Sequence, residues 1–186
     1  MDAFIACWEA KRVYDSSRPW TLVRQLHAGK TVKGWAGPGK GVMDIPAEKW
    51  HPYSPATFVT PPFPGFPSGH SAVSGACART LELLTGGDQF GTVELRTAGS
   101  LTEPGFACEL MQAFHGKPAE GGKLTCDVAL KLPTFSATAE LAGISRVMGG
   151  YHIQTDNVEG LKMGRRVAEH NWPIVKSYFD GTAATK

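Results

Sequence analysis

The stretch from Gly29 to Gly65 constrains the fold of this chain more than any other feature, because glycine and proline recur throughout it. Proline removes a backbone donor and glycine favours turns, so no regular element is expected to run far in this stretch. On both sides of it, apolar residues recur at the spacing of helices. The chain is therefore predicted to be helices separated by long irregular connections.

Start and stop signals delimit these helices. Pro19 suits the first position of the second helix, and Gly86-Gly87 ends the third. Asp156 or Asn157 would cap the fifth. Alternating residues suggest a small β-hairpin, at 92–95 and 124–128. We predict an all-α helical bundle with long loops, to which such a hairpin can be added. Its helices are expected over about 2–14, 19–26, 70–84, 135–148 and 157–170, with a short one after Pro173.

Composition excludes some partners. The net charge is only +2, and no run of Lys and Arg carries interleaved aromatic residues, so no nucleic-acid partner is expected. No apolar stretch approaches the roughly 18–20 residues that cross a bilayer, so no membrane partner is expected either. The compartment stays open.

The four cysteines show no C-x-x-C pair and no metal-finger spacing. Cys7 and Cys77 lie in apolar helical stretches, where they are expected as small buried residues. Cys108 and Cys126 lie in the loop-rich middle and are able to pair. Four cysteines allow three connectivities, so their disulfide state is left open.

Lys11 and Arg18 are two cations seven residues apart, a spacing that puts residues on one helix face. Trp8 and Tyr14 in the same stretch indicate that Lys11 is partly buried. A buried cation needs an anion or a carboxylate to compensate its charge. Taken alone, this pair is better explained as a solvated basic face.

The segment from Pro61 to Ser71 combines a proline-rich approach with a helix start at Ser68-Gly69-His70. Unpaired N–H groups and the helix dipole favour an anion at such a start. The Ser68 hydroxyl adds a donor, Gly69 lets a ligand approach the backbone, and His70 can exchange a proton near neutral pH. An ordinary turn with Ser68 as its N-cap explains this segment equally well.

Arg146, His152 and Asp156 form the third cluster, and Gly149-Gly150 turns the chain back between the first two. Asp156 would accept a hydrogen bond from one ring nitrogen of His152, which leaves the other nitrogen basic and oriented. Alone, a helix-terminal Arg and a surface His are slightly favoured. Taken together, the three clusters suit a tetrahedral, highly charged oxyanion.

In chain order these clusters read K-x6-R-P from Lys11 to Pro19, P-S-G-H from Pro67 to His70, and S-R-x5-H-x3-D from Ser145 to Asp156. The chain thereby resembles the vanadium-dependent haloperoxidase and type-2 phosphatidic acid phosphatase (PAP2) superfamily, over residues 8 to about 165. The resemblance implies a helical bundle of the vanadium haloperoxidase/acid phosphatase type. Residues 1–186 would be a single catalytic domain, the C-terminal half of the family's usual helical domain.

The resemblance also implies a cofactor, vanadate, or phosphate in the same site. His152 would bond to the metal, His70 would act as acid and base, Asp156 would orient His152, and Lys11 would also polarise peroxide. Lys11, His70 and His152 would thus be catalytic. The residues that bind the oxyanion would be Lys11, Arg18, Ser68, Gly69, His70 and Arg146.

Two features favour a haloperoxidase, which oxidises halide with hydrogen peroxide to hypohalous acid for a small organic substrate. Trp8 and Phe63 lie in stretches that look like haloperoxidase sequences, and they are assigned to the halide or substrate region. The gap between His70 and Ser145 is longer than in the phosphatase signature. The alternatives are an acid phosphatase that hydrolyses phosphate monoesters through a phosphohistidine, and a non-catalytic oxyanion-binding remnant.

One departure from the family concerns length. Family haloperoxidases are longer and carry helices before the lysine motif, which supply an acidic partner for the site cations. Here Asp2 is the upstream residue that could take this part. Either a partner chain completes the bundle, as a homo-oligomer, or the chain is a truncated form.

Overall fold

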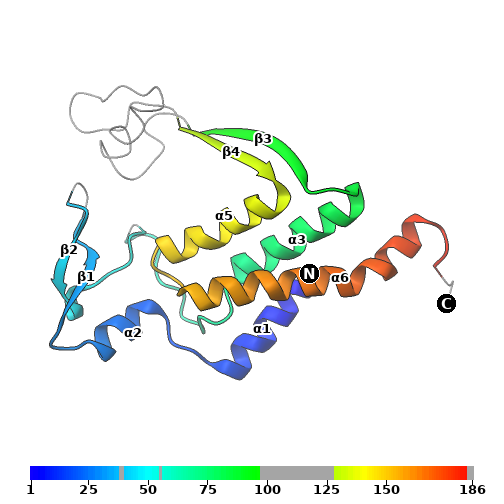
Figure 1. Ribbon diagram of the computed structural model, residues 1–186. Coiled ribbons are helices and arrows are strands. Elements are labelled where there is room, and N and C mark those ends of the chain that lie inside the picture. Colours follow the sequence, from blue (N-terminus) through cyan, green and yellow to red (C-terminus); the bar gives the residue numbers. More distant parts are fainter. Residues whose placement is uncertain (38–39, 55, 97–127, 184–186) are drawn as a thin grey trace. The chain divides into compact units, whose positions relative to one another are not determined.

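The computed structural model describes residues 1–37, 40–54, 56–96 and 128–183 (Figure 1). Its contacts divide the chain into two compact units. The first unit contains the described residues of 1–19, 60–90 and 133–186, and the second those of 20–59 and 91–132. Three separate stretches of sequence thus build the first unit, which holds all the predicted site residues.

The first unit is a bundle of four helices: α1 (Asp2–Tyr14), α3 (Gly69–Thr85), α5 (Phe135–Met148) and α6 (Gln154–Phe179). Helices α3 and α6 are the most closely packed pair. They run parallel, because Gly160 of α6 lies against Ser68 and Gly164, one turn later, lies against Ala72. The N-terminal ends of both helices therefore meet at one end of the bundle.

Glycines allow this close approach of α3 and α6. A Cβ on Gly164 would overlap the carbonyl oxygen of Ala72, and one on Gly75 would lie 2.7 Å from the carbonyl oxygen of Leu161. The two backbones are therefore in direct contact, without side chains between them. Ala78, Ala139 and Leu161 form the buried apolar cluster, with Phe135 packed against it.

The boundaries of α3 agree with the capping residues predicted from the sequence, whereas those of α6 do not. Ser68 caps α3, its hydroxyl accepting a hydrogen bond from the Ser71 amide at 3.3 Å, and Gly86 ends this helix with φ 76°. The predicted cap of α6 is wrong: Ile153 precedes the helix, and Asp156 and Asn157 lie inside its first turn. Asp156 caps from within, because its Oδ2 accepts a hydrogen bond from the Ile153 amide at 3.3 Å.

The predicted end of this helix near His170 is also wrong, because α6 continues through Pro173 to Phe179. A proline inside a helix leaves the carbonyl of the preceding turn without its usual donor. Pro173 is exposed, so water can reach that part of the backbone and the helix tolerates the break in its hydrogen bonds.

The second unit contains α2 (Pro19–Leu26) beyond its first residue, and a hairpin of β1 (Thr31–Trp35) and β2 (Val42–Pro46). These strands are antiparallel, with Thr31 opposite Pro46 and Trp35 opposite Val42. The glycine-rich stretch thus holds a hairpin that the sequence analysis missed. Gly37 and Gly41, at φ 119° and 66°, lie in the turn that joins its strands.

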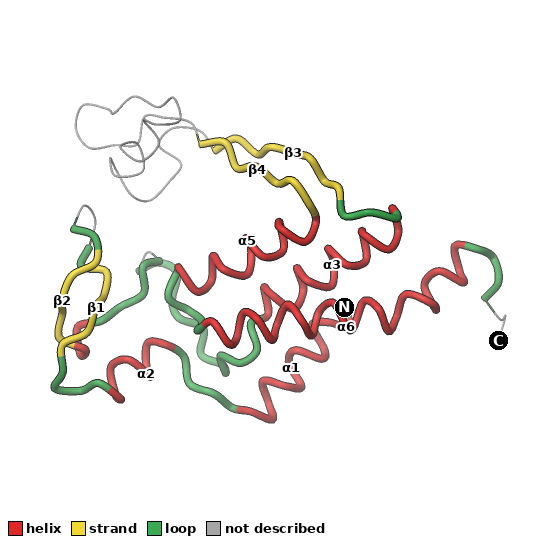
Figure 2. The backbone as a smooth tube through the Cα atoms, in the orientation of Figure 1, coloured by secondary structure: helices red, strands yellow, loops and turns green. Residues whose placement is uncertain are grey.

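A short 3₁₀ helix, η1 (Ala47–Lys49), follows β2, and β3 (Gln89–Arg96) pairs with β4 (Val128–Thr134). The first strand of the predicted hairpin lies inside β3, whereas 124–127 lie outside the described residues. Figure 2 draws the strands of both pairs in yellow. The prediction of an all-α bundle with a small hairpin is confirmed.

Within the described ranges, none of the helices has the combination of length and apolar composition that crossing a membrane requires.

Candidate active site

Lys11 is buried in the last turn of α1, with 2% of its surface exposed. Its Nζ donates hydrogen bonds to the carbonyl oxygens of Pro64 at 2.7 Å and Gly65 at 2.9 Å. Burial and, to a smaller extent, the nearby positive charge of Arg18 lower the pKa of this amine to about 8. Lys11 is therefore a cation held close to its point of deprotonation.

Arg18 meets Lys11 by a different route from the predicted common helix face. Helix α1 ends at Tyr14, and Asp15 turns the chain with φ 39°. The backbone that follows docks on the proline-rich segment, where Ser16 accepts hydrogen bonds from the amides of Gly65 and Phe66. A turn therefore brings the two cations together, since helix periodicity does not extend as far as Arg18.

Arg18 joins distant parts of the chain at the site. Its Nε donates to the carbonyl oxygen of Phe63 at 3.0 Å, and its Nη1 donates to that of Tyr151 at 3.1 Å. The same Nη1 lies 3.1 Å from Nε2 of His152. Only 6% of Arg18 is exposed, so its guanidinium is fixed inside the protein.

His152 lies between Arg18 and Asp156. Its Nδ1 is 2.9 Å from Oδ2 of Asp156, and both side chains are buried. Because an arginine only donates, Nε2 is the acceptor and Nδ1 carries the proton that Asp156 accepts. Burial lowers the pKa of His152, and the charges of Arg18 and Lys11 lower it too. Asp156 acts in the opposite direction and raises this pKa, but the net shift is downward. The ring is therefore neutral, with a basic nitrogen facing the cations.

The Ser68-Gly69-His70 segment lies at the start of α3. Ser68 is buried, and its amide donates to the carbonyl oxygen of Asp156 at 2.9 Å. Cys7 lies beneath Gly69, since a Cβ there would be 4.0 Å from its Sγ. Desolvation lowers the pKa of His70, although part of its side chain is exposed, and the charges of Arg146 and Arg18 lower it further.

Arg146 lies in the last turn of α5, with its Cζ 4.9 Å from the ring centroid of Tyr151. The Tyr151 side chain is almost fully buried, and its carbonyl oxygen is the one that Arg18 binds. Burial lowers the pKa of Arg146. Tyr151 thus separates two of the three cations and holds both in place.

Two aromatic rings border the cations. The Trp8 and Phe63 centroids are 4.9 Å apart, and Arg18 Cζ and Lys11 Nζ lie 4.9 Å and 5.5 Å from the Phe63 centroid. Trp8 is 40% exposed, so this stack reaches from solvent to the buried charges. The residues assigned to a substrate region from sequence therefore do lie beside the cations.

The electrostatics of this cluster favour an anion. Among the described residues, no carboxylate forms an ion pair with Lys11 or Arg18, whose hydrogen bonds go to carbonyl groups and to His152. Asp156 is the carboxylate that acts on both, and it is already bound to His152. Two buried cations, Lys11 and Arg18, beside one carboxylate leave a positive excess that a multiply charged oxyanion would compensate.

No group of three or more His, Cys, Asp or Glu able to hold a metal cation occurs in the part of the chain that the structure describes. Vanadate would be held differently, by one imidazole nitrogen and by donors to its oxygens. The donor set observed here fits that mode of binding.

Three buried residues of this region were missed by sequence reasoning. Ser71 Oγ donates to Asn157 Oδ1 at 2.8 Å, and Gly143 packs against both. Ser71 and Asn157 directly follow the motif residues His70 and Asp156. Their position beside the motifs was the available signal, and nothing in their spacing indicated that they would meet.

The two described cysteines differ. Cys7 is buried, as predicted, and its Sγ donates to the carbonyl oxygen of Pro67 at 3.7 Å. Burial raises the pKa of this thiol. Cys77 is exposed, so its predicted burial is wrong: its side chain lies on the open side of α3. Cys108 and Cys126 lie outside the described residues.

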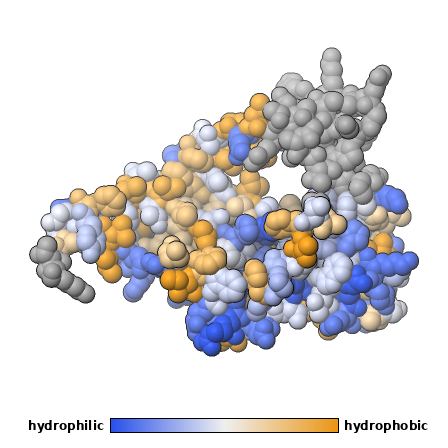
Figure 3. Space-filling model, turned by 180° about the vertical axis from the view of Figure 1, so that it is seen from behind, coloured by the Kyte–Doolittle hydropathy of each residue, from blue (hydrophilic) through white to orange (hydrophobic). Residues whose placement is uncertain are grey.

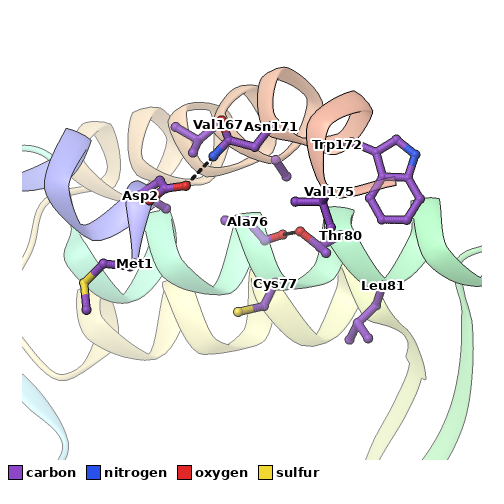
Figure 4. Close-up of a pocket in the computed structure, with 12 residues that line it drawn as sticks. Met1, Asp2, Ala76, Cys77, Thr80, Leu81, Val167, Asn171, Trp172 and Val175 are labelled. Atoms are coloured by element: carbon purple, nitrogen blue, oxygen red, sulfur yellow. Dashed lines mark hydrogen bonds between the residues drawn. The ribbon is translucent and has the colours of Figure 1, made fainter. Parts of the chain in front are cut away.

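A second hollow, of about 430 Å³, opens at the other end of the first unit (Figure 4). Asn171 Nδ2 donates to Asp2 Oδ2 at 2.5 Å across its rim. It contains none of the predicted site residues, and most of its lining is apolar: Met1, Asp2, Ala3, Ala76, Cys77, Thr80, Leu81, Val167, Ala168, Asn171, Trp172 and Val175.

Comparisons with known proteins point in one direction. The model of the vanadium chloroperoxidase (VCPO) second helical-bundle domain matches residues 1–181. A search of curated proteins found no match.

Solved structures give the same result. The chain is similar to an apo-type bacterial vanadium-dependent chloroperoxidase, at 25% identity and a TM-score of 0.75, over 95% of this chain and 34% of that one. It is also similar to a holo-type bacterial vanadium-dependent chloroperoxidase, at 26% identity and a TM-score of 0.69, over 89% of this chain and 31% of that one. A third similar structure is a bacterial vanadium-dependent iodoperoxidase, at 26% identity and a TM-score of 0.54, over 90% of this chain and 29% of that one. The chain thus spans about a third of the length of these proteins.

Proposed function

Since the chain belongs to the family of the vanadium chloroperoxidase second helical-bundle domain, we propose that the cluster around His152 binds vanadate and serves a haloperoxidase reaction. The observation that carries this proposal is the state of His152. Its Nδ1 is held by Asp156 at 2.9 Å, and its Nε2 faces the guanidinium of Arg18 at 3.1 Å. A neutral imidazole oriented in this way is prepared to donate its lone pair to vanadium.

The oxygens of the anion would be held by Lys11, Arg18 and Arg146, with the Ser68 hydroxyl and the Gly69 amide. Lys11 and Arg18 now donate to carbonyl groups, so an oxyanion would share their donors at little cost in rearrangement. The start of α3 adds the positive end of its dipole. Such fixed donors, held in place before binding, supply most of the electrostatic stabilisation in sites of this kind.

His70 would move the proton. Its pKa lies below the ordinary value because of desolvation and the charges of Arg146 and Arg18, so its ring is neutral at neutral pH. A neutral ring at the helix start can accept a proton from a reactant and return it. Vanadate, when bound, would supply the chemistry by which hydrogen peroxide oxidises halide to hypohalous acid.

Phe63 and Trp8 would form the wall of the halide or substrate region. Their rings are tilted against each other, and Phe63 lies beside Lys11 and Arg18, so this apolar wall would suit a weakly hydrated halide or a small organic substrate. Lys11 would polarise the peroxide from the side of this wall. We propose the same roles for these residues as the resemblance implies.

The experiment is an assay of the purified chain with hydrogen peroxide, bromide and a phenol dye, with and without orthovanadate. We expect bromination that depends on orthovanadate. Hydrolysis of an aryl phosphate that orthovanadate inhibits would instead assign the site to an acid phosphatase. Binding of orthovanadate with neither activity would identify an oxyanion-binding remnant, and absence of binding would refute the proposal.

We also propose that the chain forms a homo-oligomer, in which a second copy would supply an acidic partner to Lys11 and Arg18, since no carboxylate among the described residues forms an ion pair with either. Light scattering during size-exclusion chromatography tests this point. A monomer with full vanadate-dependent turnover would contradict it.

A further inference from the structure

We infer that Ser71 and Asn157 form a positioning pair, which fixes the start of α3 relative to the start of α6 and so sets the place of His70 opposite His152. The inference rests on the proposed function, because its consequence is the affinity of the site for an oxyanion. Neither residue belongs to the three motifs, and neither is expected to touch the anion.

The first observation is the contact itself. Ser71 Oγ donates to Asn157 Oδ1 at 2.8 Å, while 0% of Ser71 and 4% of Asn157 are exposed. A buried polar pair is costly to separate, because each group would lose its partner without gaining water. The distance between the two backbones at this point is therefore strongly determined.

The second observation is where the pair lies in the chain. Ser71 directly follows His70, and Asn157 directly follows Asp156, the residue that holds His152. A parallel link joins the Ser68 amide to the Asp156 carbonyl oxygen at 2.9 Å. Two hydrogen bonds, three residues apart on α3, thus tie the two helix starts and oppose both sliding and rotation.

The third observation brings in α5. A Cβ on Gly143 would overlap Asn157 Oδ1 and lie 3.0 Å from Ser71 Oγ, so this helix packs directly on the pair. Gly143 precedes Arg146 by three residues, the spacing of neighbours on one helix face. The helices that carry His70, Arg146 and Asp156 therefore converge on the pair.

Ordinary packing would also place a hydrogen bond in a core, so the test must separate positioning from stability. Donors to an oxyanion act over short, fixed distances, and a small displacement weakens several of them together. A role in stability alone lowers the melting temperature and leaves the affinity of the folded protein unchanged. A positioning role lowers that affinity as well.

The experiment compares Ser71→Ala and Asn157→Leu with the control Leu161→Ala. Leu161 lies in the buried cluster with Ala78 and Ala139, so its truncation weakens the same helices away from the site. Calorimetric titration with orthovanadate, and with orthophosphate as a redox-inert probe, measures affinity at a temperature where thermal unfolding shows each variant folded.

We expect each pair variant to bind both anions at least tenfold more weakly, while Leu161→Ala stays within twofold of the unmodified chain at a similar loss of melting temperature. The double variant Ser71→Ala/Asn157→Leu should bind no more weakly than the weaker single variant, because the two residues act as one contact.

If a pair variant does not fold, Gly143→Ala gives a second route, since it displaces the Asn157 amide and removes neither polar group. The same loss of affinity is expected. Unchanged affinity in the folded pair variants or in Gly143→Ala, with normal binding by the unmodified chain, would overturn the inference and leave the proposed function intact. Failure of the unmodified chain to bind either anion would overturn both.

Discussion

Helices α3 and α6 run side by side, yet their two ends have opposite chemistry. At their starts the buried groups are polar, with Ser68 and Asp156 linked through their backbones. At the other end an open, mostly apolar hollow lies between them, with Leu81 and Val175 among its partly exposed lining. The same pair of helices thus has buried polar groups at one end and a mostly apolar hollow at the other (Figure 4). Figure 3 shows hydrophobic residues, in orange, on one face of the molecule.

Helix direction explains this difference. Because α3 and α6 are parallel, the positive ends of both dipoles and the amides of both first turns meet where His70 and His152 lie. The opposite ends offer carbonyl groups and no cluster of buried cations. The proposed site therefore depends on the pairing of two helix starts. The charged side chains add to the positive electrostatic potential that the backbone amides of these starts provide.

The largest effect should come from His152→Ala. Loss of the imidazole removes the proposed bond to vanadium, and we expect vanadate-dependent turnover to fall by about a thousandfold or more. Leu84→Ala, an exposed position at the other end of α3, is the matched control and should keep its turnover. The bromination assay measures both. Retained turnover in His152→Ala would break the assignment of chemistry to the helix starts.

Gly164→Ala should disturb both ends together, because it separates the helices in the middle. Its Cβ would overlap the carbonyl oxygen of Ala72, and overpacking of this kind lowers the free energy of unfolding by about 3 kcal/mol. Gly87→Ala meets no atom within 4 Å and should be nearly neutral. Chemical denaturation compares the two. Equal stability would show that the close contact of the backbones is not required.

The pH dependence of Lys11 should have opposite signs for stability and for binding. Its pKa is about 8 in the folded protein and 10.5 ordinarily, so between these values the unfolded chain holds the proton that the folded chain has lost. The free energy of unfolding should therefore rise with pH in this window, by up to roughly 1.4 kcal/mol per pH unit.

Oxyanion affinity should fall over the same range, because the neutral amine no longer attracts the anion. Lys11→Met is the control, and both slopes due to Lys11 should be absent from it. Denaturation and titration calorimetry between pH 7 and 10.5 would give the two slopes. A parallel fall of stability and affinity in the unmodified chain, with no difference from Lys11→Met, would show that Lys11 is not the group that titrates.

The smallest perturbation is chemical labelling of the cysteines. Cys77 is exposed beside the hollow and should react quickly with a thiol reagent, whereas Cys7 is buried under Gly69 with a raised pKa and should react only on unfolding. In a variant with Cys108→Ser and Cys126→Ser, only Cys7 and Cys77 can be labelled. Mass spectrometry of the labelled peptides measures the rate at each cysteine. Equal rates in the native protein would contradict the contrast between the two ends.

The sequence predicted the elements that carry strong local signals. Pro67, Ser68 and Gly86 delimit α3 correctly, because caps and turns depend on neighbouring residues. Local reasoning misplaced the start of α6, since Asp156 caps it from inside the first turn. It also missed the hairpin of β1 and β2, because glycine and proline were taken as signs of irregular backbone when they supply its turn.

For the site, the motifs indicated which residues to examine, and the structure brings them into one unit. The prediction that Lys11 and Arg18 lie on one helix face was wrong, because α1 ends before Arg18. A turn after α1, whose backbone is hydrogen-bonded to the proline-rich segment, brings Arg18 to the site instead. Ser71 and Asn157 could not be paired from the sequence. Their contact joins residues 86 positions apart and follows from the packing of three helices.

The hydrogen bonds from Arg18 to residues 151 and 152 join positions 133 and 134 apart in the chain. At a synthesis rate of roughly 5–20 residues per second, the arginine is made roughly 7 to 27 seconds before its histidine partner. During that interval the nascent protein lacks the imidazole of His152, although Lys11 and Arg18 are already made. If the proposed function holds, loading with an oxyanion would follow the synthesis of residue 152, and chains interrupted before it would be made without the proposed anchor.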